Sequence, residues 1–428
     1  MKVSFYTLGC RLNQAETAII AKAFQQKGFE ITAFGQPADV TVINTCTVTE
    51  QADSKCRQAV RKILRRNPDT FVAVVGCYAQ MAVDTIRKIQ GVDLIVGNEY
   101  KLHLSDHLNG LVKQQTPRVV HSPKISRGEF SIESYGLYDN ATRANLKIQD
   151  GCNFVCSFCI IPTARGPARS RKFDDIIREA EILVDNGHQE LVLTGVNIGT
   201  YQSDRKTVID ILERLEKIRD LKRIRISSIE PTTVADEIIQ IMANSDKICK
   251  HLHIPLQSGD DRILQAMRRK YTVSEFEDFI HFVLKTVPDI GIGTDVMVGF
   301  PGEDHTAFVN TKKFLADLPV SYYHVFTYSD RPGTGSIRMN NKVEHQVKKD
   351  RTKILIEQGN RKKRAYYERF AGQTMEVLFE QKNQDNLWSG YTSNYMRVVV
   401  AGEGDCHNQL IPVQLTKVSG EQIFGILR

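Results

Sequence analysis

The sequence predicts an α/β protein with three domains: an N-terminal doubly wound parallel sheet, a central open (β/α)6 partial barrel and a small C-terminal β-barrel. Three observations lead to this prediction. The chain has 428 residues, which is more than one ordinary core holds. Apolar strand-like runs alternate with helix-like runs over most of its length, as in parallel sheets covered by helices. After Gly372 the pattern changes to short strands separated by Gly and Asn turns.

The first domain is expected over residues 1–112. Its strands are expected at 3–9, 40–45, 71–76 and 93–97, and its helices at about 14–26, 50–66 and 79–89. Residues 113–142 lose this periodicity and mix Pro, Ser, Gly and charges, which indicates a linker with one strand in TPRVVHS.

Three cysteines of the first domain each follow a different predicted strand, namely Cys10, Cys46 and Cys77. The carboxyl ends of parallel strands meet at one edge of a sheet, where ligands bind. The sequence therefore predicts a single three-thiol site at this edge. The alternative is core packing, since free cysteines are commonly buried. Buried positions without a ligand role are expected for Cys56, Cys249 and Cys406.

The central domain is expected over residues 143–370. Its six strands are expected at 145–151, 190–195, 223–228, 251–256, 291–299 and 322–327, with helices at 174–186, 208–219, 234–243, 274–286 and 306–315. Strands joined by helical crossovers fit an open (β/α)6 partial barrel. In barrels of this kind the active site lies at the carboxyl ends of the strands.

The loop after the first barrel strand contains a C-x3-C-x2-C run formed by Cys152, Cys156 and Cys159. Three thiolates can each hold one iron of a cubane [4Fe–4S] cluster and leave the fourth iron open for a small ligand. Structural zinc is one alternative, but it requires four closed ligands. The next Cys or His after this run is His188, outside the following 25 residues. The run therefore favours an iron–sulfur site over zinc or free thiols.

The composition predicts a cytosolic protein. Nine cysteines, an odd number in a chain without an export signal, argue against a disulfide framework. No apolar run approaches the ~20 residues that span a bilayer, so no membrane partner is expected.

The charge pattern predicts a polyanionic partner. The formal net charge is +7, and residues 331–370 hold 12 Lys/Arg against four acids. A long helix is expected over 343–370. Charge-rich helices are usually solvated faces, but this one carries mainly one sign.

The C-terminal segment, residues 371–428, is expected to form a small β-barrel, and its placement resembles that of the TRAM domain, which implies that it binds RNA. Small β-barrels bind RNA through stacked aromatic rings and backbone contacts. Core packing is the alternative for each aromatic residue. The candidate contacts are Trp388, Tyr391, Tyr395, Arg397 and Lys417.

Several motifs resemble a known family. The C-x3-C-x2-C loop resembles the cluster loop of the radical S-adenosylmethionine (SAM) superfamily. TLGCRLNQAET, NTCTVTEQAD and VVGCYAQ resemble the N-terminal domain of the methylthiotransferases, and HIPLQSGDDRILQAMRRKYT and VGFPGE resemble their barrel. The last segment resembles the TRAM domain. The resemblance implies a radical SAM partial barrel, a TRAM-like barrel and two [4Fe–4S] clusters, one on each cysteine triplet.

The resemblance also implies contacts to SAM. Gly195 at a strand end would let a ligand approach the backbone, and Asn197 and Glu230 would hydrogen-bond the amino acid or ribose part. Arg165 matches a family arginine and is expected to contact SAM or substrate. For each residue alone, a turn or capping role is the alternative. The expected cofactor contacts are Phe158, Arg165, Gly195, Asn197, Ser228, Glu230, His253, Gln257 and Asp295.

The activity that the resemblance implies is methylthiolation. An electron from the barrel cluster cleaves SAM to a 5′-deoxyadenosyl radical, and the other cluster holds sulfur that a second SAM methylates. TLGCRLNQAET and RISSIEP are most similar to the branch that acts on C2 of N6-threonylcarbamoyladenosine beside the tRNA anticodon. The expected partners are tRNA and an electron donor such as flavodoxin or ferredoxin.

Other functions remain open at this point. One branch of the family acts on isopentenyladenosine in tRNA, and another on an aspartate of a ribosomal protein. A noncatalytic RNA-binding protein with structural zinc is the alternative from a different class.

Overall fold

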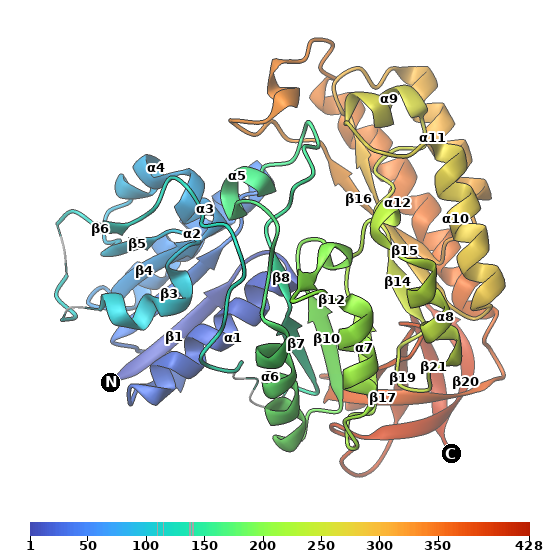
Figure 1. The fold of residues 1–428 in the computed structure, drawn as a ribbon, viewed down its shortest axis with the longest axis horizontal. Coiled ribbons are helices and arrows are strands. Elements are labelled where there is room, and N and C mark those ends of the chain that lie inside the picture. The colour runs from blue at the N-terminus through green and yellow to red at the C-terminus, as the bar shows by residue number, and fades with distance from the viewer. Residues whose placement is uncertain (109, 114, 137, 139–140) are drawn as a thin grey trace.

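The computed structural model describes residues 1–428 except 109, 114, 137 and 139–140. Figure 1 shows three units: an N-terminal sheet with its helices in blue, a central set of strands and helices in green to yellow, and a red C-terminal barrel below the central strands. The predicted fold class is confirmed in all three parts.

The first unit is a six-stranded parallel sheet with the order β2-β1-β3-β4-β5-β6. Central strands β3 and β4 are buried along their whole length and rich in Val and Ile, as expected for strands covered on both faces. The strands are β1 (Lys2–Thr7), β2 (Glu30–Thr32), β3 (Val40–Thr45), β4 (Phe71–Gly76), β5 (Leu94–Val96) and β6 (Arg118–Val120). The strand expected in TPRVVHS is β6, which extends this sheet beside β5.

Helices cover both faces of the sheet. Phe24 of α1 (Arg11–Gln26) packs in one core cluster, and Ile63 of α2 (Glu50–Arg66) packs in another. Thr49 caps α2 by accepting a hydrogen bond from the Ala52 amide at 3.2 Å. The third predicted helix is instead two short helices, α3 (Cys77–Met81) and α4 (Val83–Arg87).

The central unit contains six parallel strands in chain order. Two three-stranded sheets, β7-β10-β13 and β14-β15-β16, are joined by bridges such as Ser228 to His253. The predicted strands are confirmed as β7 (Arg143–Lys147), β10 (Glu190–Thr194), β13 (Arg223–Ile226), β14 (His251–His253), β15 (Gly291–Val298) and β16 (Tyr322–Thr327).

The predicted crossover helices are confirmed as α6 (Phe173–Asp185), α7 (Val208–Glu216), α8 (Asp236–Asn244), α10 (Val273–Thr286) and α11 (His305–Asp317). Their buried faces share one large core with the strands, for example Leu212 and Ile280. Shorter elements are α5 (Ile161–Arg165), α9 (Asp261–Ala266), the strand pairs β8 (Gln149–Asp150) with β9 (Arg169–Ser170) and β11 (Gln202–Ser203) with β12 (Lys206–Thr207), and 3-10 helices at Lys101–His107, Ile198–Thr200, Pro231–Thr233 and Gly335–Arg338.

The basic helix is α12 (His345–Glu368), and a closed five-stranded barrel follows it. Tyr366, Tyr367 and Phe370 at the end of the helix pack into the core of this barrel, so the two elements are firmly joined. The barrel has the order β17-β18-β19-β21-β20, with β17 (Thr374–Lys382), β18 (Leu387–Thr392), β19 (Arg397–Ala401), β20 (Leu410–Ser419) and β21 (Gln422–Leu427). Among the described residues, every helix is too short or too polar to span a lipid bilayer.

Candidate active site

The topology brings the first three cysteines to one edge of the N-terminal sheet. Cys10, Cys46 and Cys77 closely follow β1, β3 and β4, which are neighbours in the sheet. Gly9 adopts a φ of +105°, and a Cβ placed there would lie only 2.7 Å from the Cys46 Cβ. The backbone beside Cys10 therefore packs directly against Cys46.

These thiols influence one another electrostatically. Burial raises the pKa of the Cys46 thiol to about 12, and the nearby thiols of Cys77 and Cys10 also raise it. The Cys77 sulfur accepts a hydrogen bond from Asn98 Nδ2 at 3.6 Å. Ionising several neighbouring thiols at neutral pH requires a positive partner, which iron would provide.

The second triplet lies on the loop between β8 and α5. The Phe154 amide donates to the Cys152 sulfur at 3.4 Å, and Arg269 Nη1 donates to the Cys156 sulfur at 3.4 Å. Burial raises the pKa of Cys159 to about 12, and the thiols of Cys156 and Cys152 also raise it. Hydrogen bonds to sulfur stabilise ligated thiolates and tune the potential of an iron–sulfur cluster.

Both triplets fit the chemistry of a three-iron attachment. Each offers three thiols that interact with one another, and each has at least one sulfur that accepts a hydrogen bond. Within the described ranges, no three Cys, His, Asp or Glu side chains are close enough to bind one metal ion. The ligands of a cubane cluster attach to separate irons and are farther apart than those of a single ion.

A cavity of about 260 Å³ lies where the three units meet. Cys10 and Arg11 enter it from the N-terminal unit, and Tyr395 enters it from the C-terminal barrel. The central unit contributes most of the remaining wall, including the predicted residues Gly195, Ser228 and His253. The other lining residues are Leu12, Val192, Thr194, Arg225, Ile226, Ser227, His251, Tyr322 and His324.

Two side chains with buried polar atoms, Asn197 and Ser227, follow strands of the central unit, and Ser227 also lines this cavity. Asn197 is 1% exposed, and its Nδ2 has no hydrogen-bond partner among the described residues; the same holds for the Ser227 hydroxyl. A Cβ at Gly195 would lie 2.9 Å from Gln149 Oε1, so a larger residue there would force the Gln149 side chain to shift. Buried polar atoms are normally satisfied, so these groups suit a polar ligand such as SAM.

The other predicted cofactor residues have protein partners. His253 Nε2 lies 2.9 Å from Asp295 Oδ1. Glu230 Oε1 accepts from Arg269 Nη1 at 3.2 Å, so Glu230 orients the arginine that contacts the Cys156 sulfur. Gln257 occupies a left-handed turn with a φ of +74°, and the Phe158 ring lies edge-on to Phe300 at 6.4 Å.

Arg165 is not among the residues that line this cavity, and its expected contact with SAM or substrate stays a prediction. Its guanidinium is 1% exposed and bonds Glu16 and Asp150 at 2.9 Å each. It also donates to Asn13 Oδ1 at 2.5 Å. Because Glu16 and Asn13 belong to the N-terminal unit, these contacts join α5 of the central unit to α1.

The candidate RNA contacts separate into three groups. Arg397 and Lys417 are exposed. Tyr391 stacks on Tyr395 with ring centroids 5.0 Å apart, and Tyr395 faces the cavity. Trp388 is 7% exposed and donates its indole N–H to the Gly404 carbonyl at 3.0 Å. Trp388 is therefore a core residue of the C-terminal barrel, which favours the core-packing alternative, and its contact with RNA stays a prediction.

The sequence reasoning missed Arg11, Arg225, His251, Tyr322 and His324 as cavity residues. A signal existed for Arg225, because two arginines interrupt the apolar strand RIRI. Its side chain is buried on the Glu190 carboxylate, with contacts of 2.6 and 3.2 Å.

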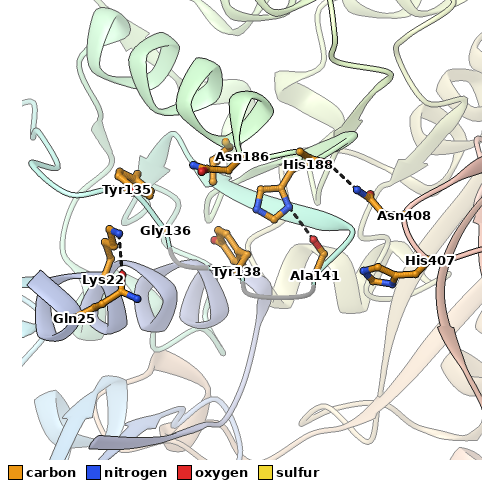
Figure 2. Close-up of a pocket in the computed structure, with 12 residues that line it drawn as sticks. Lys22, Gln25, Tyr135, Gly136, Tyr138, Ala141, Asn186, His188, His407 and Asn408 are labelled. Atoms are coloured by element: carbon orange, nitrogen blue, oxygen red, sulfur yellow. Dashed lines mark hydrogen bonds between the residues drawn. The ribbon is translucent and has the colours of Figure 1, made fainter. Parts of the chain in front are cut away.

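Figure 2 shows a second cavity, of about 410 Å³. Its lining includes Lys22 and Gln25 of α1, His188 after α6, and His407 and Asn408 of the C-terminal barrel. None of the nine cysteines lines it.

Comparison with known proteins identifies the family. Residues 146–315 match the radical SAM superfamily, and residues 2–97 match uncharacterized protein family UPF0004. The chain is 40% identical to threonylcarbamoyladenosine tRNA methylthiotransferase MtaB of Bacillus subtilis (strain 168), over 97% of this chain and 94% of that protein. It is 32% identical to tRNA-2-methylthio-N(6)-dimethylallyladenosine synthase of Clostridium botulinum (strain Loch Maree / Type A3), over 98% of this chain and 95% of that protein.

Solved structures agree on the fold. The radical SAM methyltransferase TsrM from Kitasatospora setae matches with a TM-score of 0.54 and 14% identity, covering 76% of this chain and 72% of that chain. The cobalamin-dependent radical SAM enzyme OxsB matches with a TM-score of 0.53 and 12% identity, covering 78% and 54%. With its two family regions and full-length relatives, the chain belongs to the radical SAM methylthiotransferases.

Proposed function

We propose that this methylthiotransferase acts on tRNA and places sulfur and a methyl group on C2 of N6-threonylcarbamoyladenosine beside the anticodon. The observation that carries this proposal is its similarity over nearly the whole chain to relatives named for threonylcarbamoyladenosine. A dimethylallyladenosine substrate is the second candidate, because relatives with that name are also similar over nearly their full length.

Membership of the family implies SAM and a [4Fe–4S] cluster. Cys152, Cys156 and Cys159 would hold this cluster. When bound, it supplies the electron that turns SAM into a source of hydrogen-abstracting radical. Arg269 donates to the Cys156 sulfur and carries positive charge there, which favours the reduced cluster.

We assign the second cluster to Cys10, Cys46 and Cys77. Cys10 lines the same cavity as Gly195 and Ser228. A base in this cavity would therefore lie between the N-terminal triplet and the carboxyl ends of the central strands. The buried Asn197 amide, which has no partner among the described residues, would orient SAM at that edge.

The RNA would approach along the C-terminal barrel and the basic helix. Arg397 and Lys417 are exposed on the barrel, and α12 carries Lys and Arg along its length. Charged groups of this kind contact phosphates without reading sequence. The geometry of the cavity therefore has to select the base.

The test uses reduced enzyme, SAM, and tRNA prepared with either threonylcarbamoyl or dimethylallyl adenosine, with flavodoxin or ferredoxin as electron donor. Mass spectrometry of digested nucleosides should find the methylthio group on threonylcarbamoyladenosine. Modification of the dimethylallyl nucleoside alone would establish the second candidate. Modification of neither would contradict a tRNA substrate and point to the ribosomal-protein aspartate.

A further inference from the structure

The cavity between the three units has an uneven charge. Its lining residues include two arginines, Arg11 and Arg225, but no Asp or Glu. Arg225 is already neutralised, because Glu190 binds it through two contacts. Arg11 has no ion pair with any described residue, and its guanidinium Nη2 donates to the Tyr395 hydroxyl at 2.7 Å. Arg11 is thus the lining side chain that carries a permanent charge without an acidic partner among the described residues.

Tyr395 holds this guanidinium from the opposite domain. The tyrosine occupies a left-handed turn with a φ of +69° between β18 and β19. Its ring lies 5.0 Å from the Tyr391 ring and 4.5 Å from the His251 ring, and the Arg225 guanidinium lies 5.0 Å from its centroid. A phenol enclosed in this way has few orientations, so it fixes Arg11 before any substrate arrives.

The charge of Arg11 is suited to a carboxylate. A guanidinium has five N–H donors in a planar fork that matches the two oxygens of a carboxylate. The Tyr395 hydroxyl uses one donor group, and the rest of the fork remains for a ligand. The side chain of threonylcarbamoyladenosine ends in a carboxylate, whereas a dimethylallyl group is apolar. An apolar group would remove water from Arg11 without replacing its hydrogen bonds.

We propose that Arg11, positioned by Tyr395, binds the carboxylate of the N6 side chain and so selects threonylcarbamoyladenosine over adenosines with an apolar N6 substituent. This inference rests on the proposed function. It makes Arg11 a specificity-determining residue and Tyr395 a positioning residue.

The experiment compares two anticodon stem-loop RNAs with loaded enzyme: one with the natural carboxylate and one with its neutral methyl ester. Wild-type enzyme should bind the ester and methylthiolate it about 10- to 100-fold less well, the range for hydrogen bonds to a charged group. Arg11→Gln should lose about the same factor on the carboxylate RNA but treat both RNAs alike. Arg11→Lys should recover part of the discrimination. Tyr395→Phe should fall between wild type and Arg11→Gln.

Arg397→Gln is the matched control, because it removes an exposed arginine of the C-terminal barrel. This variant should weaken the binding of both RNAs by the same factor. Iron content is measured for every variant, because Arg11 adjoins Cys10. If Arg11→Gln loses iron, the role of Arg11 is judged from Tyr395→Phe and from the ratio of the binding constants of the two RNAs. Equal discrimination by wild type and Arg11→Gln would overturn the role of Arg11 while leaving the proposed function intact. Failure of wild type to modify the carboxylate RNA would overturn the proposed function itself.

Discussion

Arg165 Nη1 lies 2.9 Å from Glu16 Oε1, and this ion pair joins α5, just after the Cys152, Cys156 and Cys159 triplet, to α1, just after Cys10. Lys101 and Lys147 bind the same carboxylate, with Lys147 Nζ at 2.8 Å. Glu16 is fully buried. One carboxylate therefore holds three cations at the junction between the two cysteine triplets.

Glu16→Gln should destabilise the protein by about 3–5 kcal/mol. Removing one member of a buried ionic group leaves its partners in low dielectric without compensation. Chemical denaturation under anaerobic conditions measures the change. Glu30→Gln is the control: Glu30 forms an exposed ion pair of 3.7 Å with Lys2, and its removal should cost less than about 1 kcal/mol. Equal effects would show that the buried group is not decisive.

The pH dependence of the unfolding free energy should show how much the ionised Glu190 carboxylate stabilises the fold. Burial opposes its ionisation, but Arg225 prevails and lowers the pKa of Glu190 from 4.5 to about 2. A lowered pKa contributes stability above pH 4.5 that is lost as the pH falls toward 2. The difference in unfolding free energy between wild type and Glu190→Gln should therefore shrink by about 2 kcal/mol between about pH 5 and pH 3. Exposed Glu213→Gln should show no such narrowing.

Iron analysis should separate the two triplets from the remaining cysteines. Replacing Cys46 or Cys156 by Ala should each remove about half of the iron and sulfide from reconstituted enzyme, because each belongs to a different cubane site. Cys56→Ala is the control and should retain full iron, since Cys56 lies on the buried face of α2. Zinc in place of iron would contradict both assignments.

Salt dependence should report how the C-terminal barrel binds RNA. The double variant Arg397→Gln and Lys417→Gln should weaken tRNA binding and reduce the slope of log K against log salt by about 1 for each phosphate that is no longer neutralised. Lys62→Gln on α2 changes an exposed lysine of the N-terminal unit and should leave the slope unchanged. An unchanged slope in the double variant would place the RNA elsewhere.

Gly291→Ala should loosen the C-terminal barrel from the central strands. A Cβ at Gly291 would lie 2.2 Å from the Asn394 backbone oxygen, and a backbone atom cannot rotate away as the end of a flexible side chain can. Limited proteolysis should then release a fragment near residue 371 faster than in wild type. Gly335→Ala is the control, because the nearest atom to its Cβ would be 3.6 Å away. Equal proteolysis of both variants would show that this packing does not hold the barrel.

The architecture could be predicted because the spacing of apolar residues along the sequence distinguishes strands from helices. The six parallel strands of the central unit alternate with helices along the sequence, and each cysteine of the N-terminal triplet closely follows a strand of the first sheet. The role of Arg165 could not be predicted, since its partner Glu16 lies 149 residues away. Tyr395 is 384 residues from Arg11, and no local pattern connects them.

Trp388 shows a different limit of prediction from sequence, namely which face of a barrel strand is buried. Side chains of a strand alternate between faces, so Trp388 and Tyr391, an odd number of positions apart on β18, must face opposite sides of the barrel wall. The alternation does not say which side is the core. That choice depends on the closure of the barrel, and it places Trp388 inside.

The position of Tyr395 also has a consequence for engineering. The turn between β18 and β19 supplies part of the cavity wall through Tyr395. The C-terminal barrel therefore cannot be exchanged for another RNA-binding domain without changing the cavity. A chimera with a foreign RNA-binding module would still bind nucleic acid. It would lack the Tyr395 side chain that lines the cavity and contacts Arg11. Recovering the original selectivity would require grafting that turn as well.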